Sequence, residues 1–147
     1  MKTLIIILIG VVIVLMAFNY PSVDFTKDSE GGIQFHRGNF NEALQIAKKE
    51  NKLVFMDIYA TWCGPCKKLK AKTFANQEVG KYFNETFVNV AFNGEDGEGI
   101  ELARKYGINS YPTLLFINSD GSIMTGSSGY HTDKELIEFG KSVNSKR

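Results

Sequence analysis

The chain has 147 residues, of which 44% are hydrophobic and 22% charged, and its formal net charge is +1. This length suits one domain of ordinary size plus a short extension, and the hydrophobic content is sufficient for a packed core. The near balance of charge, with no basic stripe, argues against nucleic acid as a partner. The sequence also contains no glycine-rich phosphate loop and no sign of a flavin, nicotinamide or metal cofactor.

The most apolar stretch lies at the N-terminus, where residues 4–18 carry no charge and Lys2 precedes them. As a helix, residues 1–20 would nearly span the hydrocarbon core of a bilayer. We therefore expect a membrane anchor over residues 1–20, with Lys2 inside and the rest of the chain on the extracytoplasmic side. A cleaved signal peptide is the alternative, although Leu15-Met16-Ala17 fits a cleavage site poorly.

Residues 21–34 are rich in polar, charged and glycine residues and include the pair Gly31-Gly32. Such a composition is typical of a linker that builds no core. We expect this linker to hold a domain of residues 35–147 a short way from the membrane.

Residues 35–147 alternate between helical and strand patterns. A capping-box pattern opens the first helix at Asn39, and a second one opens the last helix at Thr132. The order predicts the α/β class, with a mixed central sheet covered by helices on both faces. The expected helices are 39–52, a stretch after Cys66 with its lysines outward, 78–84, 100–106 and one from 132, and the expected strands are 53–60, 87–92, 113–117 and 122–127.

The two cysteines of the chain, Cys63 and Cys66, stand two residues apart where the buried strand 53–60 turns into a helix. A helix N-terminus stabilises negative charge, so Cys63 should have a lowered pKa and act as a nucleophile. Cys66 falls on the same helical face within disulfide reach, and Pro65 suits the first turn. This arrangement indicates a dithiol that closes and reopens by thiol–disulfide exchange.

Three other interpretations of the cysteines compete with redox chemistry. A structural disulfide usually joins distant segments, whereas this one would close a very small loop. A zinc site needs about four ligands, and His36 and His131 have no suitable spacing to complete one. Two inert buried cysteines would not need the spacer Gly64-Pro65 or a strand–helix junction. Redox chemistry is therefore the favoured interpretation.

An acidic residue, Asp57, lies within the apolar strand before the cysteines. Burial among apolar side chains should raise the pKa of this carboxyl group. A perturbed acid beside a reactive thiol is typical of a functional site, so we expect Asp57 to accept a proton from Cys66. An acid satisfied by local hydrogen bonds, with no role, is the alternative.

Several motifs resemble those of the thioredoxin family. Residues 62–66, Trp-Cys-Gly-Pro-Cys, match the thioredoxin active site letter for letter, Asp57 matches the buried acid, and residues 110–113 match the cis-proline loop. The likeness covers residues 39–144. Residues 73–79 more closely resemble the C-terminal domain of the membrane thiol:disulfide interchange reductase. The resemblance implies the thioredoxin fold and a thiol–disulfide oxidoreductase.

The resemblance also implies roles for individual residues. Cys63 attacks and Cys66 resolves, while Pro112 is cis and the backbone of Tyr111 pairs with a bound chain. Thioredoxins usually carry a lysine beside the buried acid, on the next strand, whereas residues 87–92 contain no basic residue. We therefore expect Asp57 to lack a cationic partner. The expected substrate-binding residues are Trp62, Gly64, Pro65, Tyr111 and Pro112.

Together these features predict an extracytoplasmic reductase of protein disulfides that works through Cys63 and Cys66 and needs no other cofactor. Because thiols outside the cytoplasm must be re-reduced through the membrane, the expected electron donor is a membrane reductase. A thiol oxidase or isomerase is one alternative. A non-catalytic module that binds a metal or a protein through the same thiols is another.

Overall fold

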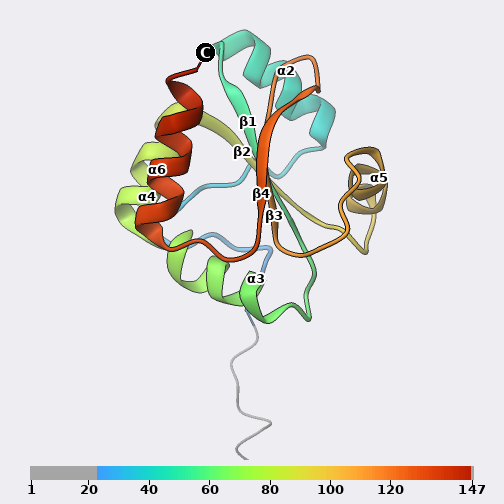
Figure 1. The fold of residues 1–147 in the computed structure, drawn as a ribbon, viewed down its shortest axis with the longest axis vertical. Coiled ribbons are helices and arrows are strands. Elements are labelled where there is room, and N and C mark those ends of the chain that lie inside the picture. Colours follow the sequence, from blue (N-terminus) through green and yellow to red (C-terminus); the bar gives the residue numbers. More distant parts are fainter. Residues whose placement is uncertain (1–22, 147) are drawn as a thin grey trace, which may run out of the picture.

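The computed structural model describes residues 23–146. Figure 1 shows a central sheet with helices on both sides of it. The predicted anchor or signal segment, residues 1–20, lies outside the described residues. Within residues 23–146, no helix has the length and apolar character that crossing a membrane requires.

The predicted order of helices and strands is confirmed. The stretch after Cys66 is divided into a short α-helix, a π-helix and a further α-helix, since the backbone N–H of Phe74 bonds back to the carbonyl of Leu69 at 2.9 Å. The helices are α2 (Phe40–Glu50), α3 (Gly64–Lys68), η1 (Leu69–Thr73), α4 (Gln77–Thr86), α5 (Glu98–Lys105) and α6 (Asp133–Asn144). The strands are β1 (Leu53–Tyr59), β2 (Phe87–Asn93), β3 (Thr113–Ile117) and β4 (Ile123–Ser128).

The four strands form one mixed sheet in the order β2-β1-β3-β4. Strand β1 is parallel to β2 and antiparallel to β3, and β3 is antiparallel to β4. All seven residues of β1 are buried, which explains why its sequence is apolar on both faces. The predicted central strand is therefore confirmed, but its neighbours are parallel on one side only.

The two faces of the sheet carry separate cores. Side chains alternate along a strand, so Phe55 of β1 points to one face and Val54 and Met56 to the other. The core around Phe55 is closed by η1, α4 and α6, and the core around Val54 and Met56 by α2 and α5. This is the predicted arrangement of helices on both faces.

The two predicted N-terminal caps, at Asn39 and Thr132, are confirmed. The side chain of Asn39 accepts a hydrogen bond from the N–H of Glu42 and begins α2. Thr132 and Glu135 form the reciprocal capping box that begins α6. These local bonds satisfy N–H groups that a helix leaves without intrahelical partners.

Residues 23–37, here called the N-terminal strap, pack against the domain. The sequence predicts a linker over residues 21–34 that stays outside the core, whereas Phe25 and Ile33 of this stretch are buried. The N–H of Ile33 donates to the carbonyl of Phe74, and that of His36 donates to the carbonyl of Asn89, each at 2.8 Å. The strap thus contributes core residues and extends the hydrogen bonding of the sheet edge.

The glycines of the strap permit this close packing. A Cβ atom on Gly32 would lie 2.3 Å from the carbonyl oxygen of Phe74, and one on Gly80 of α4 would lie 2.2 Å from that of Gly31. Such distances are below van der Waals contact. The pair Gly31-Gly32 therefore allows two backbones to lie in contact. In the sequence alone, the same pair is equally typical of a flexible linker.

Candidate redox site

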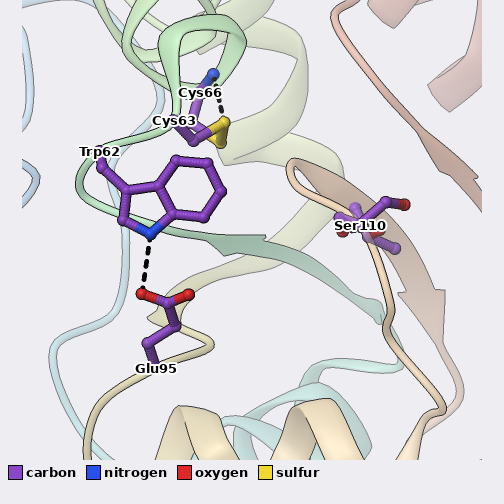
Figure 2. Close-up of a disulfide and its surroundings, with 6 residues drawn as sticks. Trp62, Cys63, Cys66, Glu95 and Ser110 are labelled. Carbon is purple, nitrogen blue, oxygen red and sulfur yellow. Dashed lines mark hydrogen bonds between the residues drawn. A yellow bond between two sulfur atoms is a disulfide. The ribbon is translucent and has the colours of Figure 1, made fainter.

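A disulfide between Cys63 and Cys66 lies directly after β1, with an S–S distance of 2.12 Å and a Cα–Cα distance of 5.3 Å. Cys63 is the N-cap of α3, and its Sγ accepts a hydrogen bond of 3.2 Å from the backbone N–H of Cys66 (Figure 2). Pro65 occupies the first turn, where its missing N–H costs no intrahelical bond. The predicted position of the pair at a strand–helix junction is confirmed.

Both cysteines are covered by neighbouring side chains, with 3% of Cys63 and 1% of Cys66 exposed. Phe25 of the strap and Tyr59 of β1 are buried in the same cluster as the two cysteines. Val23 and Tyr111 are partly buried against this cluster. The cluster around the pair therefore combines the end of β1, which lies close to it in sequence, with two segments that are distant in sequence, the strap and the loop before β3.

Trp62 lies beside the pair and is 66% exposed. Its ring Nε1–H donates to the carboxylate Oε2 of Glu95 at 2.8 Å, as Figure 2 shows. Its ring also makes an edge contact with Tyr111, with centroids 6.2 Å apart. Glu95 was not among the site residues predicted from the sequence, because the acidic loop 93–99 gave no indication of where it folds.

The loop before β3 contains the cis peptide bond between Tyr111 and Pro112 that the resemblance implies. The hydroxyl of Thr113 donates to the carbonyl of Ser110 at 2.8 Å. The N–H of Gly129 donates to the carbonyl of Pro112 at the same distance. These bonds fix the loop, with the Tyr111 ring in contact with both Trp62 and the cysteine cluster.

Asp57 is buried in β1, and within the described part of the chain its Oδ1 has no hydrogen-bond partner. Burial raises the pKa of this carboxyl group from 3.8 to about 7, while the charge of Lys70 lowers it. The expected direction of the pKa shift is confirmed. The expectation that Asp57 lacks a cationic neighbour is wrong, because a lysine from η1 acts on it in place of one from β2.

Lys70 is 7% exposed, so the prediction that the lysines of this helix all point outward is wrong for this residue. It stands four residues after the buried Cys66, and residues four apart share a helix face. That spacing was the sequence feature that could have predicted the burial of Lys70. An ammonium group in such a position needs a partner, because burying an unpaired charge is costly.

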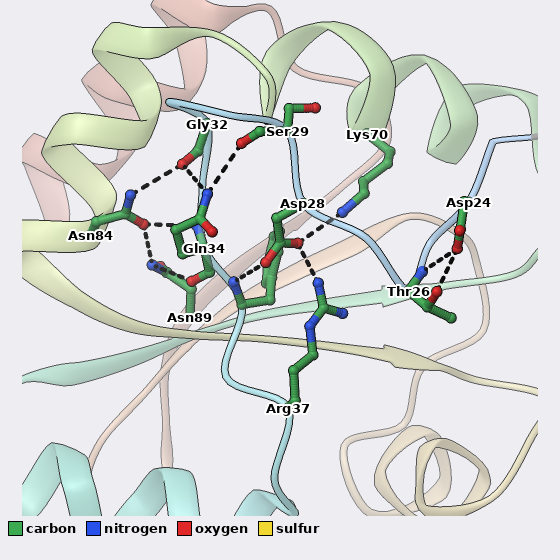
Figure 3. Close-up of polar contacts among 11 residues, drawn as sticks. Asp24, Thr26, Asp28, Ser29, Gly32, Gln34, Arg37, Lys70, Asn84 and Asn89 are labelled. Carbon is green, nitrogen blue, oxygen red and sulfur yellow. Dashed lines mark hydrogen bonds and ion pairs between the residues drawn. The ribbon is translucent and has the colours of Figure 1, made fainter.

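Asp28 of the strap supplies that partner. Its Oδ1 lies 3.1 Å from the Nζ of Lys70 and also contacts the guanidinium of Arg37, as Figure 3 shows. Its Oδ2 accepts a hydrogen bond of 2.9 Å from the backbone N–H of Phe35. The strap is therefore joined by a nearly buried ion pair to the helical segment that follows the cysteines.

Residues 40–144 match a family model described as Thioredoxin-like domain. The chain belongs to this thioredoxin-like family. Its mixed sheet, its cysteine pair and its cis-proline loop are thus those of a thiol–disulfide oxidoreductase with the thioredoxin fold. Such proteins use their own cysteines as the redox group and need no further cofactor. Among residues 23–146, no group of three or more histidine, cysteine or acidic residues forms a metal site.

Two curated relatives illustrate the breadth of the similarity. Thioredoxin-T of Drosophila melanogaster is 34% identical over 90 residues, which are 61% of this chain and 54% of that protein. Thiol:disulfide interchange protein DsbD of Pasteurella multocida is 34% identical over 99 residues, 64% of this chain and 17% of that protein. The chain thus spans about half the length of the first relative and about a sixth of the second.

Two solved structures are also similar. A putative disulphide-isomerase from Bacteroides thetaiotaomicron has 43% sequence identity and a TM-score of 0.69, covering 82% of this chain and 98% of that one. The oxidised C-terminal domain of DsbD from Neisseria meningitidis has 27% identity and a TM-score of 0.60, covering 75% of this chain and 97% of that one. The likeness to the C-terminal domain of the interchange reductase, first indicated by residues 73–79, is confirmed.

Proposed function

We propose that this protein is a membrane-tethered, extracytoplasmic reductase of protein disulfides. The observation that carries the proposal is the closed Cys63–Cys66 pair at the start of α3, next to an exposed tryptophan and a cis-proline loop. The family supports the exchange chemistry. The apolar residues 4–18 behind Lys2 support the tether and the side of the membrane.

The reaction begins with the reduced pair. The thiolate of Cys63 attacks one sulfur of a substrate disulfide, a mixed disulfide forms, and the first substrate sulfur leaves as a thiolate that takes up a proton. Cys66 then loses its proton and attacks the sulfur of Cys63, which releases the second substrate thiol. The substrate gains two electrons and two protons, and the pair becomes the disulfide seen in the structure.

Asp57 is suited to take the proton of Cys66, directly or through a water. A general base works best when its pKa is close to the working pH, and burial raises the pKa of Asp57 to about 7. Asp57 belongs to the same strand as Tyr59, which is buried in one cluster with both cysteines. The carboxyl group therefore belongs to the strand that leads into the redox pair.

The proposed direction is reduction. Thioredoxin itself has a potential near −270 mV, against about −120 mV for a strong oxidant whose thiolate is unusually stabilised. Such stabilisation requires additional donors or positive charge near the thiolate, and the spacer Gly64-Pro65 provides neither. Within the described chain, the hydrogen bond to the Sγ of Cys63 comes from the Cys66 backbone.

The proposed substrates are proteins with disulfides. Trp62 offers an exposed apolar contact. As the resemblance to thioredoxins implies, the Tyr111 backbone beside the cis bond to Pro112 would add strand-like hydrogen bonds to an extended chain. The proposed electron donor is a membrane reductase that carries a dithiol, since oxidation of one dithiol must accompany reduction of the Cys63–Cys66 disulfide. The relatives named thiol:disulfide interchange protein are consistent with such an exchange.

A trapping experiment tests the proposal. In the variant Cys66→Ser, the mixed disulfide on Cys63 cannot be resolved, so protein partners should remain attached until dithiothreitol releases them. Cys63→Ser is the matched control and should trap much less. If neither variant retained partners, or if both variants retained them equally, the assigned order of attack would be overturned.

Equilibration of the protein with glutathione or dithiothreitol buffers tests the direction. A potential more negative than about −220 mV supports a reductase, and one above about −160 mV would instead make the protein an oxidase. Stoichiometric metal uptake with no disulfide reductase activity would favour a non-catalytic binding module.

A disulfide isomerase is the second candidate, because the Bacteroides protein with 43% identity is described as a putative disulphide-isomerase. An isomerase acts catalytically on scrambled substrates and leaves their total number of disulfides unchanged. Counting the free thiols of a scrambled protein substrate before and after incubation with the reduced protein separates the two activities.

A further inference from the structure

The N-terminal strap starts at the same end of the domain as the redox pair. Val23, the first described residue, packs against the cluster that contains Cys63 and Cys66. Two residues later, the ring of Phe25 stacks on Tyr59, with centroids 4.2 Å apart and planes 7° from parallel. Figure 1 shows the start of the described chain beside α3, while the turn between β3 and β4 lies at the opposite end of the sheet.

The strap is fixed to the domain. Phe25 is buried, and the carboxylate of Asp28 is bonded to Lys70, Arg37 and the N–H of Phe35. Further along, Gly31 lies in backbone contact with α4. Because most of these contacts are buried or nearly so, the strap does not act as a swivel, and Val23 is held against the cysteine cluster.

The remaining connection to the apolar N-terminal run is short. Phe18 ends that run, and four residues separate it from Val23. Fully extended, this connection spans at most about 18 Å. A domain of this size has a radius of gyration of about 14 Å and is therefore roughly 36 Å across. The connection is shorter than the domain, so the end from which it leaves decides which face lies near the membrane.

We propose that the face around Cys63 and Cys66 is the membrane-proximal face of the domain. We propose that this face docks on a membrane-embedded thiol–disulfide protein whose cysteines are accessible near the bilayer surface. The proposal rests on the proposed function, in which residues 1–20 form the anchor. A gap of at most about 18 Å is too narrow for a folded soluble protein of similar size to enter freely. The exposed Trp62 suits this location, because tryptophan is enriched at membrane–water interfaces.

The lone tryptophan of the chain provides the test, since Trp62 lies beside the redox pair. Reduced full-length protein is inserted into phosphatidylcholine–phosphatidylglycerol vesicles that contain a dansyl-labelled lipid. Flotation with the vesicles is checked first, and energy transfer from tryptophan to dansyl is then measured. The matched control is the double variant Trp62→Phe with Ser119→Trp, which moves the fluorophore to the far turn and is checked for folding by circular dichroism. Transfer from position 62 should exceed that from position 119 several-fold.

A spacer variant gives a functional measurement. Twenty glycine and serine residues inserted between Ser22 and Val23 add a root-mean-square length of about 25 Å. In the vesicle-bound protein the spacer should lower transfer from Trp62 and raise the rate of reduction of soluble insulin several-fold. The rate with a small aromatic disulfide should change little, because a small molecule enters the gap in either case.

The outcomes separate this inference from the proposed function. Protein that floats with the vesicles but transfers energy equally from both positions, or more from position 119, overturns the membrane-facing orientation and leaves the anchor intact. Protein that does not float overturns the anchor, and the orientation with it. Unchanged insulin reduction in the spacer variant also contradicts the proposal.

Discussion

Lys70 reaches from η1 to Asp28 of the strap, with 3.1 Å between Nζ and Oδ1. The same ammonium group acts on Asp57, whose pKa is raised by burial and lowered by the charge of Lys70. One lysine thus joins the N-terminal strap to the acid that we assign as proton acceptor. This relationship connects a packing feature at the edge of the domain with the chemistry of the redox pair.

Replacing Lys70 by methionine should raise the pKa of Asp57 further, because the lowering charge is lost while the burial remains. The pH midpoint of the resolving step should move to higher pH, and NMR titration of the Asp57 carboxyl group should show the same direction. Asp28 keeps Arg37 as an ionic partner, so the strap should stay in place.

The matched control is Lys72→Met, which removes an exposed lysine from the same helical segment. It should leave the midpoint unchanged. Equal midpoints in the wild-type protein and the Lys70 variant would show that the charge of Lys70 does not reach Asp57.

Asp57→Asn should stabilise the protein at neutral and higher pH. The pKa of Asp57 is raised to about 7, so the folded state binds this proton more tightly than the unfolded chain does. The wild-type protein therefore loses stability as the pH rises from about 4, where the unfolded carboxyl group ionises, to about 7, and the loss levels off above that. The full difference is up to roughly 4 kcal/mol at 1.36 kcal/mol per pKa unit.

Urea denaturation of oxidised wild type and variant at several pH values measures this difference. The curves should converge near pH 4 and separate toward pH 8. The variant should also resolve mixed disulfides more slowly, because it has no carboxylate to accept the proton of Cys66. A constant stability difference across this pH range would contradict the assigned pKa.

Much of the redox site could be predicted from the sequence because it depends on local patterns. The strand 53–60, the caps at Asn39 and Thr132 and the position of Cys63 at a helix start each follow from residues within a few positions of one another. The cis bond before Pro112 came from the resemblance, since sequence alone says only that the preceding residue avoids the helical region.

The contacts between distant segments could not be predicted in the same way. Polar and glycine residues around Phe25 and Ile33 gave the strap the composition of a linker, although its partners on β1 and α4 bury it. Glu95 pairs with Trp62 across 33 positions, and no local pattern indicates that distance. Lys70 is the intermediate case: its lysine side chain was expected to point outward, although its spacing of four residues from Cys66 is the local feature that indicates the buried face.

Phe25→Ala should destabilise the protein by about 3 kcal/mol, the low end for buried phenylalanine, since the ring is stacked on Tyr59 at the edge of the core. Lys27→Ala, an exposed change in the same segment, is the control and should have almost no effect. Thermal denaturation of both variants measures the difference. If Phe25→Ala were as stable as wild type, the segment would behave as the loose linker that its composition indicates.

The bond between Glu95 and Trp62 should affect protein substrates more than small ones. Glu95→Ala removes the acceptor for the Nε1–H of Trp62, and the freed ring should show lower fluorescence anisotropy. Because the bond is exposed, its loss is worth about 0.5 kcal/mol, or a two- to threefold rise in KM for a protein disulfide. A small aromatic disulfide, which does not need the Trp62 surface, should be reduced at an unchanged rate.

Two further variants separate the hydrogen bond from the charge. Glu95→Gln keeps an acceptor oxygen and should retain both the anisotropy and the KM of the wild-type protein. Asp96→Ala removes a neighbouring acid of the same loop that is exposed and should also leave both unchanged. If Glu95→Gln instead matched Glu95→Ala, the charge of Glu95 would be the feature that protein substrates sense. If all three variants behaved as wild type, the fixed orientation of Trp62 would have no part in substrate binding.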